Sequence, residues 1–187
     1  MQFIVIDGLD ASGKSTQAKL LASFLKKRGW TVFLRIHPCN DNFFGIRAKN
    51  FLKQKGKSAH FNAALFYMCD IIRSIIIYSW RRYDYIIFVR YLMGTAYLPK
   101  PADRLAYRFF ATTVPTSRYM FFLDVHPAEA YKRARKRVEE LEMFESLEEL
   151  EKIRQKALTL ALEDNWIIVE ADRTIKQVQE EILRSII

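Results

Sequence analysis

The sequence predicts an α/β fold, a five-stranded parallel sheet with helices on both faces. Five short apolar runs rich in β-branched residues alternate with longer segments of helical periodicity. No two strands are joined by a hairpin signal, so each connection is expected to cross the sheet through a helix. Six Gly and five Pro among 187 residues leave few breakers, and most of the chain should be regular.

The elements follow one another from the first residues to the last. The run Phe3 to Ile6 opens the first strand, and Gly29 ends the first helix in the usual C-terminal position. The strands are expected at 2–7, 31–36, 83–89, 118–125 and 166–170. The helices are expected at 15–28, 43–55, 61–80, 104–112, 128–140, 147–162 and 175–186. No repeat and no Pro-, Gly- or Ser-rich linker interrupts them, so residues 1–187 are predicted to form one domain.

The composition narrows the class of protein. Half of the residues are hydrophobic, which excludes a disordered chain, and the net charge of +9 favours anionic partners. Cys39 and Cys69 fit no metal spacing or disulfide framework, and no signal peptide is visible, so a reduced cytoplasmic protein is expected. The apolar stretch 63–80 carries Asp70 and Arg73 at its middle, which favours a buried amphipathic helix over a membrane span.

A glycine-bracketed loop between the first strand and the first helix has the pattern G-x-x-x-x-G-K-[ST]. In such loops, successive backbone N–H groups and the positive helix end surround a phosphate. Lys14 is expected to reach the β- and γ-phosphates of ATP, and the Ser15 hydroxyl to bind Mg²⁺. The residues expected to bind ATP are Gly8, Asp10, Ala11, Ser12, Gly13, Lys14, Ser15 and Thr16.

The loop alone does not say what becomes of the triphosphate. A GTPase should carry N-K-x-D, which is absent, and motor proteins are usually longer. A small-molecule kinase instead needs a second site for an acceptor.

The loop segment, Asp7 to Ser15, is followed along the chain by further segments: Ile36-His37-Pro38 with Gly45-Ile46-Arg47, Ala64 to Asp70, Val89 to Leu98, Phe122 to Val125, and Trp166 to Asp172. In their order and spacing, these segments resemble the thymidylate kinase family over nearly the whole chain. The resemblance implies a nucleoside monophosphate kinase fold with a small lid at about 132–146. It implies transfer of the ATP γ-phosphoryl group to a deoxynucleoside monophosphate, first of all dTMP.

The resemblance also assigns an acceptor site. Arg90 would hold the acceptor phosphate with support from Arg47, Phe66 would stack on the base, and Tyr97 would lie at the sugar. Asp10 would also bind the acceptor. The alternatives are a solvated strand end for Arg90, a solvated stem for Arg47 and a core aromatic for Phe66.

A basic run from Lys132 to Arg137 matches the lid that closes on the phosphates in the family. Arg133 and Arg137 lie four residues apart, on one helical face, and are the candidates for a catalytic arginine. The alternative is a solvated basic face.

Three positions depart from the family pattern. Val89 replaces an acidic residue near the metal, His37 replaces a glutamate, and Asp70 falls where an arginine reads thymine. A carboxylate accepts hydrogen bonds, so Asp70 suggests an amino-bearing base such as cytosine or guanine. Alternatively, Asp70 pairs with Arg73 and Arg73 reads thymine.

Two rival classes remain from the sequence. A catalytically weak ATP-binding regulatory module is suggested by Val89, and a nucleic-acid-binding protein by the charge alone. No zinc spacing or RNA-binding signature supports the second, so neither a nucleic acid nor a membrane is expected as a partner. The resemblance implies a homodimer, and the apolar helix at 63–80 would suit the interface between the two subunits.

Overall fold

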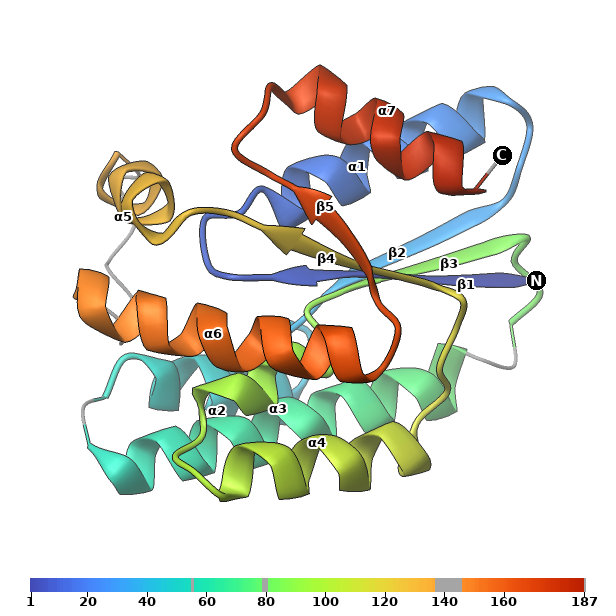
Figure 1. Cartoon of the computed structure of the whole chain (residues 1–187). Helices are drawn as coiled ribbons and strands as arrows, with labels where there is room; N and C mark the ends of the chain where they lie inside the picture. The colour runs from blue at the N-terminus through green and yellow to red at the C-terminus, as the bar shows by residue number, and fades with distance from the viewer. Residues whose placement is uncertain (55, 79–80, 137–145, 187) are drawn as a thin grey trace.

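The protein has a three-layer α/β fold in the computed structural model, which describes residues 1–54, 56–78, 81–136 and 146–186 (Figure 1). Five parallel strands lie in the order β2-β3-β1-β4-β5. Their bounds are β1 Gln2–Gly8, β2 Val32–Ile36, β3 Tyr85–Val89, β4 Tyr119–Asp124 and β5 Ile167–Glu170. The predicted sheet is confirmed, each strand within two residues of its expected ends.

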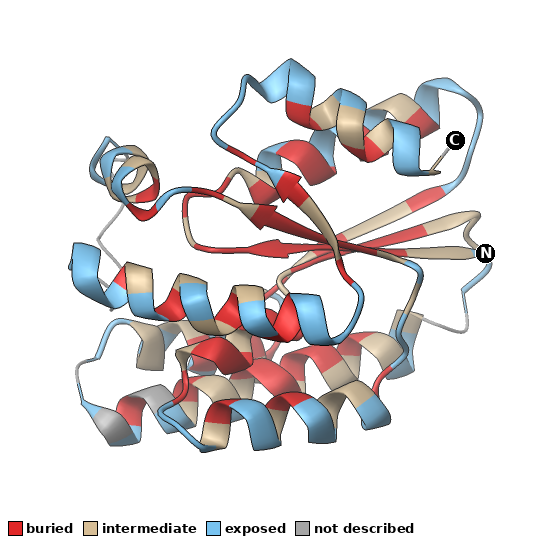
Figure 2. Ribbon diagram, viewed as in Figure 1, coloured by how far each residue is buried: buried red, intermediate tan, exposed pale blue. Residues whose placement is uncertain are grey.

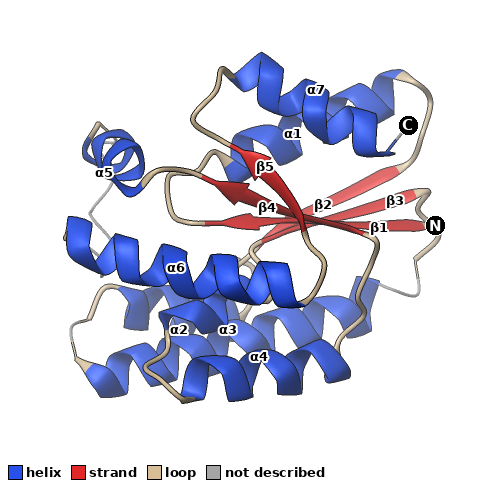
Figure 3. Ribbon diagram, viewed as in Figure 1, coloured by secondary structure: helices blue, strands red, loops and turns tan. Residues whose placement is uncertain are grey.

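Helices cover both faces of the sheet (Figure 3). One layer holds α1 (Lys14–Lys27) and α7 (Ile175–Ile186), and α5 (Pro127–Arg135) lies beyond the carboxyl edge of β4. The opposite layer holds α2 (Phe43–Leu52), α3 (Lys57–Tyr78), α4 (Ala102–Thr113) and α6 (Leu147–Glu163). A short 3-10 helix, η1 (Met93–Tyr97), follows β3 and was not predicted, because its five residues are too few to show periodicity.

Some helix ends differ from expectation. The helix predicted at 43–55 ends at Leu52, and the one predicted at 61–80 begins four residues earlier, at Lys57. Asn42 caps α2 by accepting a hydrogen bond from the Gly45 amide. The helix predicted at 128–140 ends at Arg135, and the rest of its predicted range beyond residue 136 lies outside the described residues, as does most of the expected lid.

The core lies where the central strands meet both helical layers (Figure 2). Ile4, Val5 and Ile6 of β1 are fully buried, as are Phe121 and Phe122 of β4. Consecutive buried residues face opposite sides of a strand, so these strands are covered on both faces. Parallel strands also bring all five carboxyl ends to one edge, which is where ligands bind in such sheets.

The apolar helix α3 belongs to this domain. By length and composition alone Phe61–Tyr78 could cross a membrane, the one such segment in the described part of the chain. It packs instead beside α2 and η1, and its Asp70 is fully buried by protein.

Candidate functional site

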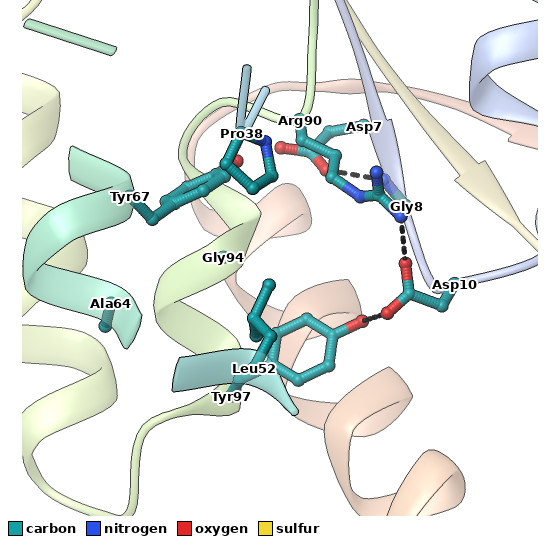
Figure 4. Close-up of a pocket in the computed structure, with 10 residues that line it drawn as sticks. All are labelled: Asp7, Gly8, Asp10, Pro38, Leu52, Ala64, Tyr67, Arg90, Gly94 and Tyr97. Atoms are coloured by element: carbon teal, nitrogen blue, oxygen red, sulfur yellow. Dashed lines mark hydrogen bonds and ion pairs between the residues drawn. The ribbon is translucent and has the colours of Figure 1, made fainter. Parts of the chain in front are cut away.

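A pocket opens at the carboxyl ends of β1 and β3 (Figure 4). The phosphate-loop side supplies charged groups, and α2, α3 and η1 supply mainly apolar walls. The lining residues are Asp7, Gly8, Asp10, Pro38, Leu52, Ala64, Tyr67, Arg90, Gly94 and Tyr97. The pocket therefore has one charged end beside the loop and one apolar end between the helices.

The loop of residues 8–13 is shaped around an anion site. Gly8 has φ +145°, and a Cβ there would lie 2.5 Å from the Leu123 carbonyl oxygen, so only glycine fits. The buried Ser12 hydroxyl has no hydrogen-bond partner among the described residues. The Ser12 hydroxyl, the N–H groups at the start of α1 and the half-buried Ser15 hydroxyl together fit a phosphate chain.

Lys14 is folded back onto its own loop. Its ammonium donates to the Gly8 carbonyl at 2.9 Å and to the Leu9 carbonyl, and lies 3.6 Å from an Asp10 carboxylate oxygen. The side chain is only 4% exposed. A buried cation of this kind is well placed to exchange these oxygens for those of a phosphate.

Asp7 joins the loop to the segment after β3. Its carboxylate accepts from the amides of Gly8 at 2.9 Å, Tyr91 at 2.7 Å and Met93 at 3.1 Å. Burial raises the pKa of Asp7, although Lys14 and these amides oppose the rise. Through these three amides, Asp7 fixes the position of the loop relative to the segment after β3.

Asp10 lies between two cations. Arg90 Nη2 donates to Asp10 Oδ1 at 2.7 Å, and the Tyr97 hydroxyl donates to Oδ2 at 3.2 Å (Figure 4). Burial alone would raise the pKa of Asp10, but Arg90 and Lys14 hold it well below its usual range. Three residues predicted from sequence, Asp10, Arg90 and Tyr97, are thus brought together.

Arg90 has an uncommon backbone conformation, with φ +60°. Its amide donates to the Ile6 carbonyl at 3.2 Å, and the next residue is tied to Asp7. A non-glycine residue in this region costs of order 1 kcal/mol and persists only where its surroundings enforce it. The strained turn directs the guanidinium across the end of β1 toward the loop.

Asp70 lies outside the pocket in a buried network. Its carboxylate accepts from the Cys39 amide and the Asn42 side chain, both at 2.7 Å, and lies 3.6 Å from the Arg35 guanidinium. Arg35 also pairs with Asp41 and donates to Ser74 at 2.6 Å. Asp70 therefore holds the segment between β2 and α2 against α3, and its ion-pair partner is Arg35 and not Arg73, the partner in the alternative interpretation of the sequence.

His37 adjoins this network. It is fully buried, with Nε2 3.0 Å from the Ser74 hydroxyl and its ring edge-on to Phe88. Burial, with an opposing effect of Asp70 and a contribution from Arg35, lowers the pKa of His37 to about 4. The next residue, Pro38, lines the pocket.

This buried histidine predicts a pH dependence of stability. Between pH 6.5 and 4 the unfolded chain binds a proton at residue 37 and the folded chain does not. The neutral, buried His37 therefore contributes fully to the free energy of unfolding above pH 6.5. This contribution falls by about 1.4 kcal/mol per pH unit as the pH is lowered toward 4. The free energy of unfolding, measured with urea at several pH values in this range, should change less steeply with pH for His37→Asn than for the wild type. An equal pH dependence of the two proteins would contradict the prediction.

Besides Asp70, four predicted residues of the acceptor site and lid lie away from the pocket. Phe66 stacks on Phe51 at 5.6 Å between ring centroids, and Arg47 is exposed, its guanidinium 5.2 Å from the centre of the Phe43 ring. Arg73 does not line the pocket. Arg133 donates to Glu129 at 2.9 Å and to the Ala171 carbonyl at 3.1 Å, against the end of β5. Arg137 lies outside the described residues.

Sequence reasoning missed the apolar part of the pocket. Ala64 and Tyr67 are three residues apart on α3 and so share a face, whereas the more prominent Phe66 faces α2. That spacing was visible in the sequence. Leu52, Pro38 and Gly94 reach the pocket from three other segments, and no local signal marks them.

Comparison with known proteins gives consistent results. The family model described as thymidylate kinase matches residues 6–182. A probable thymidylate kinase of Pyrococcus abyssi is 29% identical over 191 residues, covering 97% of this chain and 93% of the relative. A thymidylate kinase of Leptospira borgpetersenii is 30% identical, covering 81% and 77%. The solved thymidylate kinase of Candida albicans, 23% identical, shares the fold with a TM-score of 0.77 over 99% of this chain and 90% of its own.

Proposed function

Because this chain belongs to the thymidylate kinase family, we propose that it transfers the γ-phosphoryl group of ATP to dTMP, giving dTDP and ADP. The observation that carries the proposal is the juxtaposition of a phosphate loop with a second pocket that contains Arg90. Lys14 and Arg90 lie on either side of one carboxylate, Asp10. A donor phosphate chain at Lys14 and an acceptor phosphate at Arg90 would meet between them.

Little covalent chemistry is required of the protein in such a transfer. Lys14 and the loop amides hold the donor phosphates, and Arg90 orients the acceptor phosphate for in-line attack. Tyr97, bonded to Asp10, forms the wall where the acceptor sugar would lie. Arg133 and Arg137 remain the proposed lid arginines, and Arg133 would have to leave Glu129 and Ala171 to reach the phosphates.

A Mg²⁺ ion would be held by the Ser15 hydroxyl. No group of three or more His, Cys, Asp or Glu side chains in the described ranges could hold a metal ion. The Asp7 carboxylate accepts from backbone amides, the Asp10 carboxylate accepts from Arg90, and the Val89 side chain has no oxygen. This donor set fits Mg²⁺, which commonly takes few protein ligands and several from phosphates and water. When bound, the ion neutralises charge that develops on the transferred group.

Arg47, Phe66, Asp70 and Arg73 do not line the pocket, so we propose no direct contact between them and the acceptor. A soluble, cytoplasmic enzyme acting on nucleotides, without nucleic acid or membrane as partner, is the proposed setting. A homodimer would use the exposed apolar side chains of α3, such as Phe61 and Leu65.

A coupled assay over all common nucleoside monophosphates tests the function. We expect ADP formation to depend on dTMP and to exceed that with other acceptors, since Asp70 does not face the pocket. Preference for dCMP or dGMP would instead support the alternative hypothesis that the acceptor carries an amino-bearing base. ATP binding without transfer to any monophosphate would make the chain a regulatory module.

A further inference from the structure

Tyr67 presents an unusual hydroxyl group to the acceptor pocket. Its side chain extends from α3 toward Pro38 and the charged end (Figure 4), and the residue is 7% exposed. Its hydroxyl oxygen is buried and has no hydrogen-bond partner among the described residues. Buried polar atoms are nearly always bonded, so this one calls for a partner that the chain does not supply.

Other buried tyrosines of this chain are bonded. The Tyr91 hydroxyl donates to the Pro115 carbonyl at 2.9 Å, and the Tyr107 hydroxyl donates to Asp164 at 2.7 Å. A hydroxyl group lacking a partner is therefore not a general property of tyrosine in this fold. Tyr97, which also lines the pocket, is bonded to Asp10, so among the described pocket residues Tyr67 is the tyrosine whose hydroxyl lacks a partner.

The two nearby carboxylates, Asp7 and Asp10, are bonded to other groups and not to Tyr67. Asp7 accepts three backbone amides, and Asp10 accepts from Arg90 and Tyr97. Burial, with a smaller effect of Asp7, raises the pKa of Tyr67 well above its ordinary value, and Arg90 opposes this. The phenol therefore keeps its proton and acts as a donor. A donor beside the Arg90 cation suits an anionic ligand.

The position of the ring is set by close packing. A Cβ atom at Gly94 would lie 2.7 Å from Tyr67 Cε1, so the absence of a side chain there makes room for the phenol ring. Gly94 follows Arg90 by four residues and lines the same pocket. The hydroxyl is thus held by packing on the side of Arg90, with no bond to orient it elsewhere.

We propose that the Tyr67 hydroxyl donates a hydrogen bond to the phosphate group of the acceptor nucleoside monophosphate bound at Arg90. Tyr67 is then a second phosphate-binding residue, supplied by α3 across the pocket from the Arg90 turn. The inference rests on the proposed function and adds to it the group that recognises the acceptor as a phosphate monoester. The base and sugar are read by other residues.

Tyr67→Phe removes this hydroxyl and little else. We expect the dissociation constant for dTMP, measured by calorimetry, to rise about tenfold, because hydrogen bonds to charged groups are among the stronger ones. Inhibition by thymidine, which lacks the phosphate, should be the same in both proteins. The melting temperature should be unchanged or higher, since a buried group without a partner has been removed.

Tyr91→Phe is the matched control. It removes a buried hydroxyl that is bonded within the protein, so it should lower the melting temperature and leave dTMP affinity unchanged. Equal dTMP affinity of Tyr67→Phe and wild type would overturn the proposal, as would a parallel loss for thymidine or a fall in stability. Wild-type binding of dTMP without transfer would count against the proposed function alone, because binding still measures the hydroxyl. A wild-type protein that binds no monophosphate would overturn both.

Discussion

Replacing Lys14 by Met is expected to reduce phosphoryl transfer about 10³-fold, mainly in kcat. The ammonium is the buried cation of the phosphate loop, and its present partners are the Gly8 and Leu9 carbonyls and Asp10. A phosphate group with developing charge would lose a preorganised partner in a site with little water, where such a contact is worth several kcal/mol. Steady-state kinetics with ATP and dTMP measure the loss.

Lys19→Met is the matched control for this experiment. Lys19 lies on the same helix, α1, but is exposed to solvent. Its replacement should leave kcat and KM unchanged. A Lys14→Met protein that is folded by circular dichroism and retains more than a tenth of the wild-type kcat would show that the loop is not the donor site.

Replacing Asp70 by Ala is expected to lower the free energy of unfolding by about 3–5 kcal/mol. Asp70 is fully buried and binds the Cys39 amide and the Asn42 side chain, and it faces the Arg35 guanidinium at 3.6 Å. Removal of the carboxylate leaves the two buried donors without an acceptor and leaves the buried Arg35 guanidinium with less opposite charge nearby. Both effects destabilise the folded state. Urea denaturation measures the change.

Glu163→Ala is the control for Asp70. Its carboxylate pairs with Arg104 on the surface, where both side chains are largely exposed, so little stability should be lost. The acceptor preference of a folded Asp70→Ala protein should equal that of the wild type. An Asp70→Ala protein with wild-type stability and an altered base preference would reverse this assignment and make Asp70 a base-reading residue.

The fold could be predicted from the sequence because its signals are local and repeated. Strand 2–7, the loop after it and the helix ending before Gly29 can be recognised from periodicity, turn chemistry and one motif. The sequence did not show η1, or that α3 begins at Lys57, since tertiary packing decides short helices and helix ends.

The candidate site could be predicted in part. Lys14, Asp10 and Arg90 meet as expected because each immediately follows a central strand or lies in the loop motif. The pocket wall formed by α3 was harder to predict. Consecutive side chains on a helix point about 100° apart, so Phe66 faces α2 whereas Tyr67 lines the pocket. The role of Asp70 depends on Arg35, Cys39 and Asn42, which no local pattern joins to it.

The carboxylate of Asp10, held 2.7 Å from Arg90 and 3.6 Å from Lys14, supplies the site with its own counter-ion. Chloride or another simple electrolyte anion would gain little by entering, because the attraction of the two cations is already partly satisfied. A phosphate chain can compete, since it also engages the loop amides and the Ser12 hydroxyl. Discrimination against ordinary salt thus arises from the number of donors that a ligand can reach, and not from the strength of the positive field.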